Sequence, residues 1–446
     1  MQMETPFKLT VQVFEANTWQ DAMILEFLEP QNGFASPCRY GYETSYLGNH
    51  LERIETLFAA AVSVRVPLTW GRESLKHVPA FLYDIAPAGA AKRFLLSRVG
   101  AQKPDNIGTD LFLLARSTPA PIGHMRIKES VLTEQGRPVV GFARQDVVER
   151  DNRFLEYAYE QGAAIGGATG AGGEAPKLLL AQGRDGLLYP DAVLEDDQVT
   201  QHWFIKFARN QGLQRDQDIL RSEYHYYKAL QVLGIETVAV EGLALEEASK
   251  PSLWMHRFDR AVSAQGVQRF AVESIYSAAG VTAPGSAMDH LNVVQLLADL
   301  WRAVGQGGQL IELVVDYLRR DLLNKILGNS DNHGRNTSII RARDGLQLAP
   351  IYDLAPMVMD DEGVTRTTKW PGALEVAGDI HWRGVCDALS HVVEPDLAFE
   401  RLRQEAQHLR ALPDILVASG VPEVTMNHPR IALRDLDRRL AEWGLR

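Results

Sequence analysis

Hydrophobic and polar residues alternate along the first part of the chain and recur at helical spacing along the last part. Residues 7–14 and 22–27 place apolar side chains at about every second position, which predicts β-strands with one buried face. From about residue 274 the apolar positions lie three or four apart, as at Val293 and Leu297, which predicts helices. The pattern therefore indicates an α+β fold with a β-rich N-terminal half and a mostly helical C-terminal part.

One predicted helix leads directly into a polar loop. Residues 310–327 carry apolar side chains at helical spacing, and residues 328–336 read Gly-Asn-Ser-Asp-Asn-His-Gly-Arg-Asn. A solvated turn rich in Asn and Asp is the ordinary interpretation of such a loop. A buried helix before it and an apolar run before Asp353 argue instead for a fixed loop. Burial of a charge is unfavourable unless the charge is paired or binds a metal, so charges held in this loop indicate a function. Three more helices are predicted near the end of the chain, at Asp396–Ala411, Leu412–Ser419 and Arg430–Trp443.

The loop is followed by a predicted β-hairpin. Asp344-Gly345 is a strong two-residue turn signal between Ser338–Ile340 and an apolar run that ends at Ile351. With this turn, antiparallel register places Asn336 opposite Asp353. An amide oxygen beside a carboxylate is a pair of ligands that suits Mg²⁺ together with nucleotide phosphates.

The spacing of the polar residues has a known chemical use. Asp331 is followed five positions later by Asn336 and then by Asp353. Protein kinases place a catalytic base, a magnesium-binding amide and a magnesium-binding carboxylate in this order. We therefore expect Asp331 to accept the proton of a substrate hydroxyl, and Asn336 and Asp353 to bind Mg²⁺.

These residues also carry a family resemblance. The segment Asn329-Ser330-Asp331-Asn332-His333-Gly334-Arg335-Asn336 and the later Tyr352-Asp353 resemble the signature of HipA-type toxin serine/threonine kinases. The resemblance implies a bilobal protein-kinase-like fold. Its parts would be a small N-terminal subdomain at residues 1–130, an N-lobe at 131–260 and a helical C-lobe at 261–446. His333 and Tyr352 match nucleotide-contacting positions.

A glycine-rich stretch at residues 162–177 precedes a predicted strand. Its backbone amides could surround a phosphate, although a flexible linker has the same composition. The resemblance implies that Gly172, Gly173, Glu174, Ala175, Pro176 and Lys177 cover ATP. Gly170 stands where the family often has an autophosphorylated serine, so the neighbouring Thr169 is the candidate for that modification.

Two further segments are candidates for ATP binding. Lys206 lies in the apolar strand His202–Phe207, where a lysine either extends its amine to a sheet edge or holds phosphates. Glu223, on the next predicted helix, would be its ion-pair partner. The resemblance implies that His256, Arg257 and Phe258 form the hinge that meets adenine through backbone groups, with Asp259 near the ribose.

Composition limits the remaining possibilities. The 446 residues carry a net charge of −11 and two widely separated cysteines. This charge argues against a surface devoted to nucleic acid, and the cysteines form neither a disulfide framework nor a metal motif. We expect a cytoplasmic protein with no signal peptide and no membrane association.

The function that these observations favour is an ATP- and Mg²⁺-dependent protein serine/threonine kinase. The resemblance implies that it phosphorylates a host protein, such as an aminoacyl-tRNA synthetase, and so arrests growth. It also implies a small helix-turn-helix (HipB-like) antitoxin and, through that complex, operator DNA. Two alternatives stay open: a small-molecule or lipid phosphotransferase, and a catalytically silent nucleotide-binding module that acts with a DNA-binding antitoxin.

Overall fold

The chain forms two compact units, and each unit is built from three separate segments. The computed structural model describes the chain apart from residues 1–6, 54–56, 135–138, 151–176 and 210–211. The first unit contains residues 1–206, 256–284 and 339–347, and the second contains 207–255, 285–338 and 348–446. This division follows the packing of segments that are distant in sequence, and the predicted parts at residues 1–130, 131–260 and 261–446 stay a prediction.

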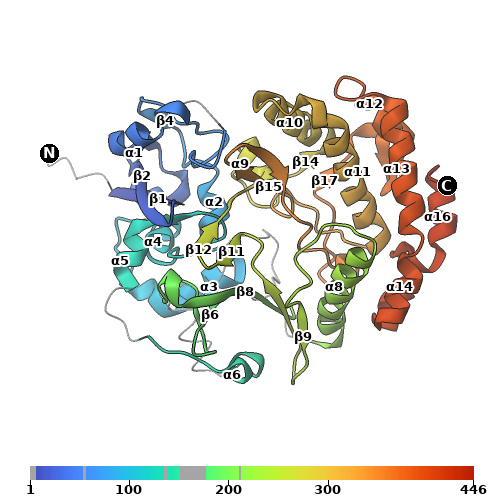
Figure 1. Ribbon diagram of the computed structural model, residues 1–446, viewed down its shortest axis with the longest axis horizontal. Helices are drawn as coiled ribbons and strands as arrows, with labels where there is room; N and C mark the ends of the chain where they lie inside the picture. The colour runs from blue at the N-terminus through green and yellow to red at the C-terminus, as the bar shows by residue number, and fades with distance from the viewer. Residues whose placement is uncertain (1–6, 54–56, 135–138, 151–176, 210–211) are drawn as a thin grey trace. The chain divides into compact units, whose positions relative to one another are not determined.

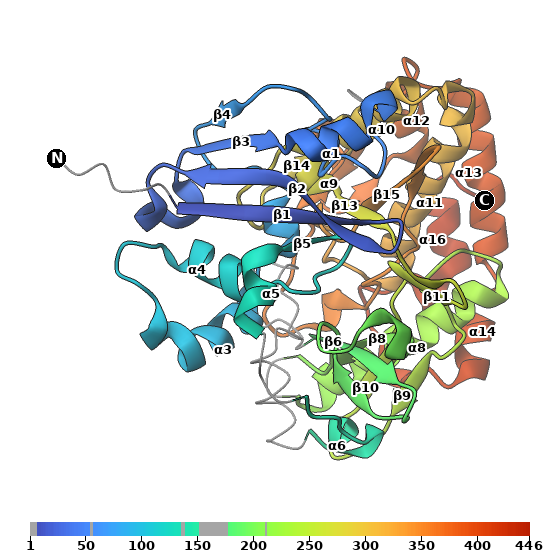
Figure 2. The same cartoon turned by 60° about the vertical axis from the view of Figure 1, so that its left-hand side comes forward.

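The first unit begins with a five-stranded antiparallel sheet in the order β4-β3-β2-β1-β5. Figure 2 shows β1, β2 and β3 alongside one another. Ala16 and Asn17 connect β1 to β2 with positive φ angles of 50° and 60°, as the tight turns of β-hairpins require. The strands are β1 (Phe7–Glu15), β2 (Thr18–Phe27), β3 (Cys38–Tyr42), β4 (Glu73–Leu75) and β5 (Met125–Ile127).

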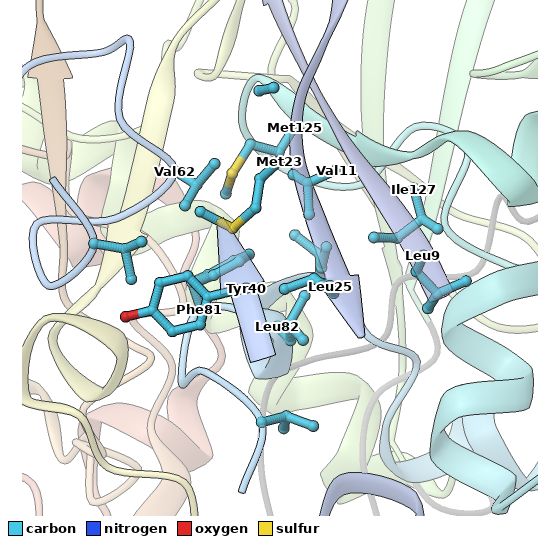
Figure 3. Close-up of a cluster of buried hydrophobic side chains, with 14 of the residues drawn as sticks. Leu9, Val11, Met23, Leu25, Tyr40, Val62, Phe81, Leu82, Met125 and Ile127 are labelled. Carbon is cyan, nitrogen blue, oxygen red and sulfur yellow. The ribbon is translucent and has the colours of Figure 1, made fainter. Parts of the chain in front are cut away.

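One face of this sheet supplies the core of the N-terminal segment. Leu9, Val11 and Leu25 are fully buried, as their alternation predicts. They pack with Phe81 and Leu82, which lie at the start of the short helix α2 (Leu82–Ile85) (Figure 3). Other helices of the first unit are α1 (Thr44–Asn49), α3 (Gly89–Val99), α4 (Thr109–Arg116), α5 (Lys128–Glu134), α6 (Arg144–Val148) and α9 (Ile275–Ala279).

The rest of the first unit is also rich in strands. Strand β6 (Lys177–Gly183) pairs on one side with β7 (Leu188–Pro190) and on the other with β8 (Val199–Phe207). Strands β11 (Arg260–Ser263) and β12 (Gly266–Arg269) form a hairpin. Strand β13 (Ala271–Ser274) joins β15 (Ser338–Ala342) and β16 (Gly345–Leu348) in a three-stranded sheet.

The second unit is mostly helical. Helix α11 (Leu310–Leu327) packs against α10 (His290–Ala303) and α13 (Pro395–Leu409), and Figure 1 shows α11 beside α13. Helix α8 (Gln214–Val232) packs against α14 (Leu412–Ser419). The remaining elements are α12 (Trp382–Ala388), α15 (Glu423–Met426), α16 (Leu436–Glu442), and the short strand pairs β9 (Ala244–Glu246) with β10 (Ser252–His256), β14 (Met288–Asp289) with β17 (Thr368–Lys369), and β18 (Glu375–Val376) with β19 (Asp379–Ile380). The predicted α+β class, with strands concentrated in the N-terminal half, is confirmed.

The predicted hairpin exists, but its register was wrong. The turn is Arg343-Asp344, and the amide of Ala349 donates to the carbonyl of Ser338 at 2.8 Å. An Asp344-Gly345 turn of the favoured type needs positive φ at both residues, and neither has it. Gly345 instead begins β16. The ladder therefore does not place Asn336 opposite Asp353, and any approach of these two side chains depends on the loops outside the hairpin.

Candidate active site

The loop that contains Asp331 begins at a fixed point. Helix α11 buries Val314, Leu318 and Leu322 completely, as predicted, and ends at Gly328 with a left-handed φ of 71°. A β-carbon at Gly328 would lie 2.6 Å from the side chain of Ile431. Only glycine meets both conditions, so the chain leaves the helix in one defined direction.

Asn329 organises the loop through its side-chain amide. Its Oδ1 accepts a hydrogen bond from the amide of Asp331 at 3.1 Å. Its Nδ2 donates to Asn324 Oδ1 at 3.0 Å and to the carbonyl of Asp353 at 3.4 Å. This buried amide thus joins the main chain of both predicted catalytic aspartates. The sequence analysis gave Asn329 no role, although it is the first residue of the motif.

The Asp331 carboxylate is accessible and lies near a histidine. Its side chain is 15% exposed, and Oδ1 lies 3.5 Å from Nε2 of the buried His333. His333 Nδ1 accepts a hydrogen bond from the amide of Arg335 at 3.2 Å, so the neutral ring carries its proton on Nε2. That N–H faces the carboxylate, which remains open to a substrate hydroxyl.

Asn336 presents an acceptor atom that no described residue satisfies. Its Nδ2 donates to the carbonyl of Asp331 at 2.6 Å, which fixes the orientation of the amide. Its Oδ1 is buried and accepts no hydrogen bond from the residues that the structure describes. A buried oxygen without a donor is unfavourable unless a ligand satisfies it. A hard cation such as Mg²⁺ fits this oxygen.

Tyr352 supports the loop rather than standing free. Its hydroxyl donates to the carbonyl of Arg335 at 2.6 Å and lies 2.6 Å from Ser338 Oγ. The next residue, Asp353, has a left-handed φ of 56°. This conformation is uncommon for a residue with a side chain and is typical of functional sites.

A second asparagine, also missed by the sequence analysis, ties the loop to β17. Asn332 Oδ1 accepts hydrogen bonds from the amides of Thr367 and Thr368 at 3.1 and 3.3 Å. Its Nδ2 donates to the carbonyl of Thr368 at 2.7 Å. Asparagines in a polar loop resemble solvated turn residues, so sequence alone gave no sign that Asn332 is buried.

The first unit carries the candidate phosphate site. Lys177 on β6 lies directly opposite Lys206 on β8, so the two side chains share one face of the sheet. Lys206 is only 4% exposed. Two lysines opposite each other repel, and an anion bound by both would relieve this repulsion. Thr169 and Gly172–Pro176, also predicted to lie here, fall outside the described residues.

The predicted hinge residues differ in their surroundings. His256 is half-buried against Trp203, with ring centroids 4.6 Å apart, and Phe258 is also partly exposed. Arg257 and Asp259 are buried, and Arg257 Nε donates to Asp259 Oδ1 at 2.9 Å. Both side chains therefore have a structural role.

A buried charge network fixes Arg257 and Asp259 in place. Arg257 also pairs with Asp191, and Asp259 accepts from Arg260 at 2.7 Å and from the amide of Gly123 at 2.7 Å. Burial opposes ionisation of Asp259, but the charges of Arg257 and Arg260 lower its pKa to about 2. The Asp259 carboxylate thus has several partners within the protein. Its predicted place near the ribose, and the recognition of adenine by main-chain groups, stay predictions.

The grouping of acidic, histidine and cysteine side chains and the apolar length of the helices limit the possibilities. Within the described ranges, no three or more histidine, cysteine, aspartate or glutamate side chains are grouped to hold a metal ion. The predicted magnesium site is of another kind, because one amide and one carboxylate would share the ion with phosphates. No helix in the described part of the chain is long and apolar enough to cross a membrane.

Comparison with known proteins agrees with the motif. The family model of the HipA-like C-terminal domain matches residues 169–412. HipA of Shewanella oneidensis MR-1, solved with HipB and operator DNA, is 16% identical with a TM-score of 0.63, covering 98% of this chain and 96% of that one. CtkA, a proinflammatory kinase of Helicobacter pylori, is 12% identical with a TM-score of 0.35, covering 63% of this chain and 92% of that one. No curated protein matches.

The two kinds of likeness show different things. At 16% identity the likeness to Shewanella HipA shows the fold alone, and it extends over nearly the whole chain. The family match spans more than half of the 446 residues and includes the loop with Asp331, Asn336 and Asp353. The chain therefore belongs to the family of HipA-type toxins, as its motif predicts.

Proposed function

We propose that this protein is an ATP- and Mg²⁺-dependent protein serine/threonine kinase of the HipA type. The observation that carries the proposal is the buried Asn336 Oδ1, which accepts no hydrogen bond from the described residues. The same side-chain amide donates a hydrogen bond through Nδ2 to the carbonyl of Asp331. An empty acceptor next to an accessible carboxylate is the arrangement that a kinase needs for a metal ligand beside a catalytic base.

Each residue has a proposed part in the reaction. Asp331 would orient the substrate hydroxyl and accept its proton, and His333, whose Nε2 lies 3.5 Å from the Asp331 carboxylate, would contact the nucleotide. Asn336 and Asp353 would hold Mg²⁺, and Tyr352 supports them. When bound, the metal would neutralise charge on the transferred phosphoryl group.

The first unit supplies the proposed nucleotide contacts. Lys177, Lys206 and the loop Gly172–Pro176 would hold the phosphates. His256, Arg257 and Phe258 would meet the adenine through backbone groups, with Asp259 near the ribose. Glu223 is proposed as the ion-pair partner of Lys206. The two belong to different units, so this pairing stays a prediction, as does modification of Thr169.

The direct test is transfer of labelled phosphate. The native protein is incubated with labelled ATP, Mg²⁺ and cell lysate, beside Asp331→Asn and a control, Asp299→Asn, whose side chain on α10 is 58% exposed. We expect one or a few labelled proteins with the native chain and the control, and none with Asp331→Asn. Unchanged labelling by Asp331→Asn would remove Asp331 from the role of base.

The same experiment separates the alternatives. Label that appears in a sugar, antibiotic or lipid but in no protein would favour a small-molecule or lipid phosphotransferase. Binding of ATP without any transfer would favour a silent module. Phosphoamino-acid analysis of a labelled protein would establish serine or threonine specificity.

We also propose a partner and a location. Shewanella HipA was solved with HipB and operator DNA, and by analogy this chain would bind a small helix-turn-helix antitoxin that itself binds an operator. Co-expression with such a protein and a gel-shift assay would test this assembly. A cytoplasmic location agrees with the two buried free cysteines, Cys38 and Cys386.

A further inference from the structure

A buried tyrosine connects helix α8 to the residue that follows Asp353. Tyr227 is fully buried, and its hydroxyl donates to Glu223 Oε1, one turn earlier on the helix, at 2.6 Å. The same hydroxyl oxygen accepts a hydrogen bond from the amide of Leu354 at 3.3 Å. Because a hydroxyl has a single proton, its donation to Glu223 directs the oxygen lone pairs toward Leu354.

The peptide bond between Asp353 and Leu354 is thereby held at both ends. Its carbonyl accepts from Asn329 Nδ2, and its amide donates to Tyr227. Asp353 has a φ of 56°. This left-handed conformation costs a residue with a β-carbon about 1 kcal/mol. Such a conformation persists only where the surroundings impose it. Among the described residues, Tyr227 and Asn329 each restrain this peptide through a hydrogen bond.

The orientation of this peptide decides where the Asp353 carboxylate points. A change in the backbone angles of Asp353 would swing its β-carbon, and with it the proposed magnesium ligand. We infer that Tyr227 is a positioning residue, which sets the Asp353 carboxylate for the metal and couples it to Glu223 on helix α8. This inference rests on the proposed function, because Asp353 has a ligand to hold only if the chain binds a nucleotide with Mg²⁺.

The electrostatic surroundings suit this role. Burial, reinforced by the charges of Glu223 and Asp353, raises the pKa of Tyr227 well above its ordinary value. The hydroxyl therefore stays protonated at neutral pH and can donate to Glu223. Glu223 is itself 2% exposed, so its hydrogen bond to Tyr227 is shielded from water. A hydrogen bond in the protein interior is stronger than one in water.

The test compares nucleotide affinity with and without Mg²⁺. Binding of a non-hydrolysable ATP analogue is titrated by calorimetry in excess Mg²⁺ and in EDTA, and the ratio of the two affinities is the magnesium gain. For Tyr227→Phe we expect an affinity in EDTA within twofold of native and a magnesium gain about tenfold smaller. A change of this size is expected when the hydrogen bond from the Leu354 amide is lost.

The chain offers a matched control in the adjacent residue. Tyr226 is also fully buried on α8, and its hydroxyl donates to the carbonyl of Leu327 at 3.1 Å. Tyr226→Phe therefore loses a comparable hydrogen bond that does not involve the Asp353–Leu354 peptide. We expect it to lower the midpoint of thermal unfolding, though by less than Tyr227→Phe, which loses two hydrogen bonds, and to keep the native magnesium gain.

The outcomes distinguish the inference from the function on which it rests. If the native protein shows no magnesium gain, the proposed function fails and the inference fails with it. If the native protein shows the gain and Tyr227→Phe retains it within twofold, only the inference is overturned. Should Tyr227→Phe not fold, Asn329→Ala takes its place, because it releases the carbonyl of the same peptide; a retained gain there would equally overturn the inference.

Discussion

Arg366 offers a quantitative test of how the segment after Asp353 is held. Its guanidinium lies between two buried carboxylates: Nη1 is 2.9 Å from Asp321 Oδ1, and Nε donates to Glu375 Oε1 at 3.0 Å. Asp321 and Glu375 are only 2% and 3% exposed. Burial opposes ionisation of Asp321, but Arg366, together with the indole of Trp370, holds its pKa well below the ordinary value.

Arg366→Met keeps most of the side-chain volume and removes the charge. The two carboxylates are then left in the interior without their cation, a change that destabilises proteins by about 3 to 5 kcal/mol. A matched control is Arg383→Met, whose side chain is 43% exposed and pairs with Asp396 at 2.6 Å and Asp387 at 3.0 Å. Exposed pairs contribute little to stability, so this variant should lose much less than Arg366→Met.

The assay is urea unfolding at pH 7 and pH 5, followed by tryptophan fluorescence. In the native protein the pKa of Asp321 is lowered, so its contribution to stability is present above its unfolded pKa and does not change between these two pH values. Arg366→Met removes the largest contribution that lowers this pKa and leaves only His290 and the Trp370 indole to oppose burial. The pKa of Asp321 therefore rises in the variant, and protonation becomes more favourable as the pH falls. The loss of stability should therefore be smaller at pH 5 than at pH 7.

Two results would refute this reasoning. One is a loss below about 1 kcal/mol at pH 7, the range of ordinary exposed pairs. The other is an equal loss at both pH values, which would show that the carboxylates are not left uncompensated. Because Thr367 and Thr368 bind Asn332 next to Asp331, we also expect Arg366→Met to lower phosphate transfer.

Two further predictions concern stability. Gly328→Ala combines a positive φ with a β-carbon 2.6 Å from Ile431. At Gly305 φ is 78° and the space is open, so Gly305→Ala should lower the free energy of unfolding by roughly 1 kcal/mol. Gly328→Ala should lower it clearly more in thermal unfolding, and equal losses would contradict the overlap. Burial, aided by nearby arginines, lowers the pKa of His124 to about 3 and that of His290 to about 4. The unfolded chain therefore binds protons at these histidines that the folded chain does not, and the free energy of unfolding should fall as the pH drops from about 6.5 toward 4. Replacing either histidine by Gln should make this decrease smaller. A free energy of unfolding in urea that is constant over this range would contradict the prediction.

The part of the site that could be predicted from the sequence is the part encoded locally. The helix over Leu310–Leu327 follows from the spacing of its apolar residues, and its C-terminal glycine has the φ that such caps require. The same local reasoning was wrong for the hairpin, where Asp344-Gly345 is a strong turn signal. The turn formed one residue earlier, which shifted the ladder by two residues relative to the prediction. A turn preference amounts to little energy beside the burial of a whole strand.

The contacts that fix the predicted catalytic residues could not be predicted, because they join distant parts of the chain. Tyr227 and Leu354 are separated by 127 positions, and Asn332 and Thr368 by 36. No local period or spacing marks such pairs. A buried tyrosine on an amphipathic helix is most simply explained as core, and only the position of its hydroxyl distinguishes Tyr227 from its neighbour Tyr226.

The hairpin after the Asp331 loop belongs to a different unit from the residues on either side of it. Its residues 339–347 belong to the first unit, whereas the residues on both sides belong to the second. Arg341, fully buried in the hairpin, is held by Glu273 at 3.1 Å and by the carbonyl of Val62 at 3.2 Å, so the excursion is fixed in the core of the first unit. Asn336 and Asp353 thus stand close to the points where the chain leaves the second unit and returns to it. On the return, the Asp353–Leu354 peptide is held by Asn329 and Tyr227, which belong to the second unit themselves. The carboxylate proposed to bind the metal is therefore positioned by contacts within that unit.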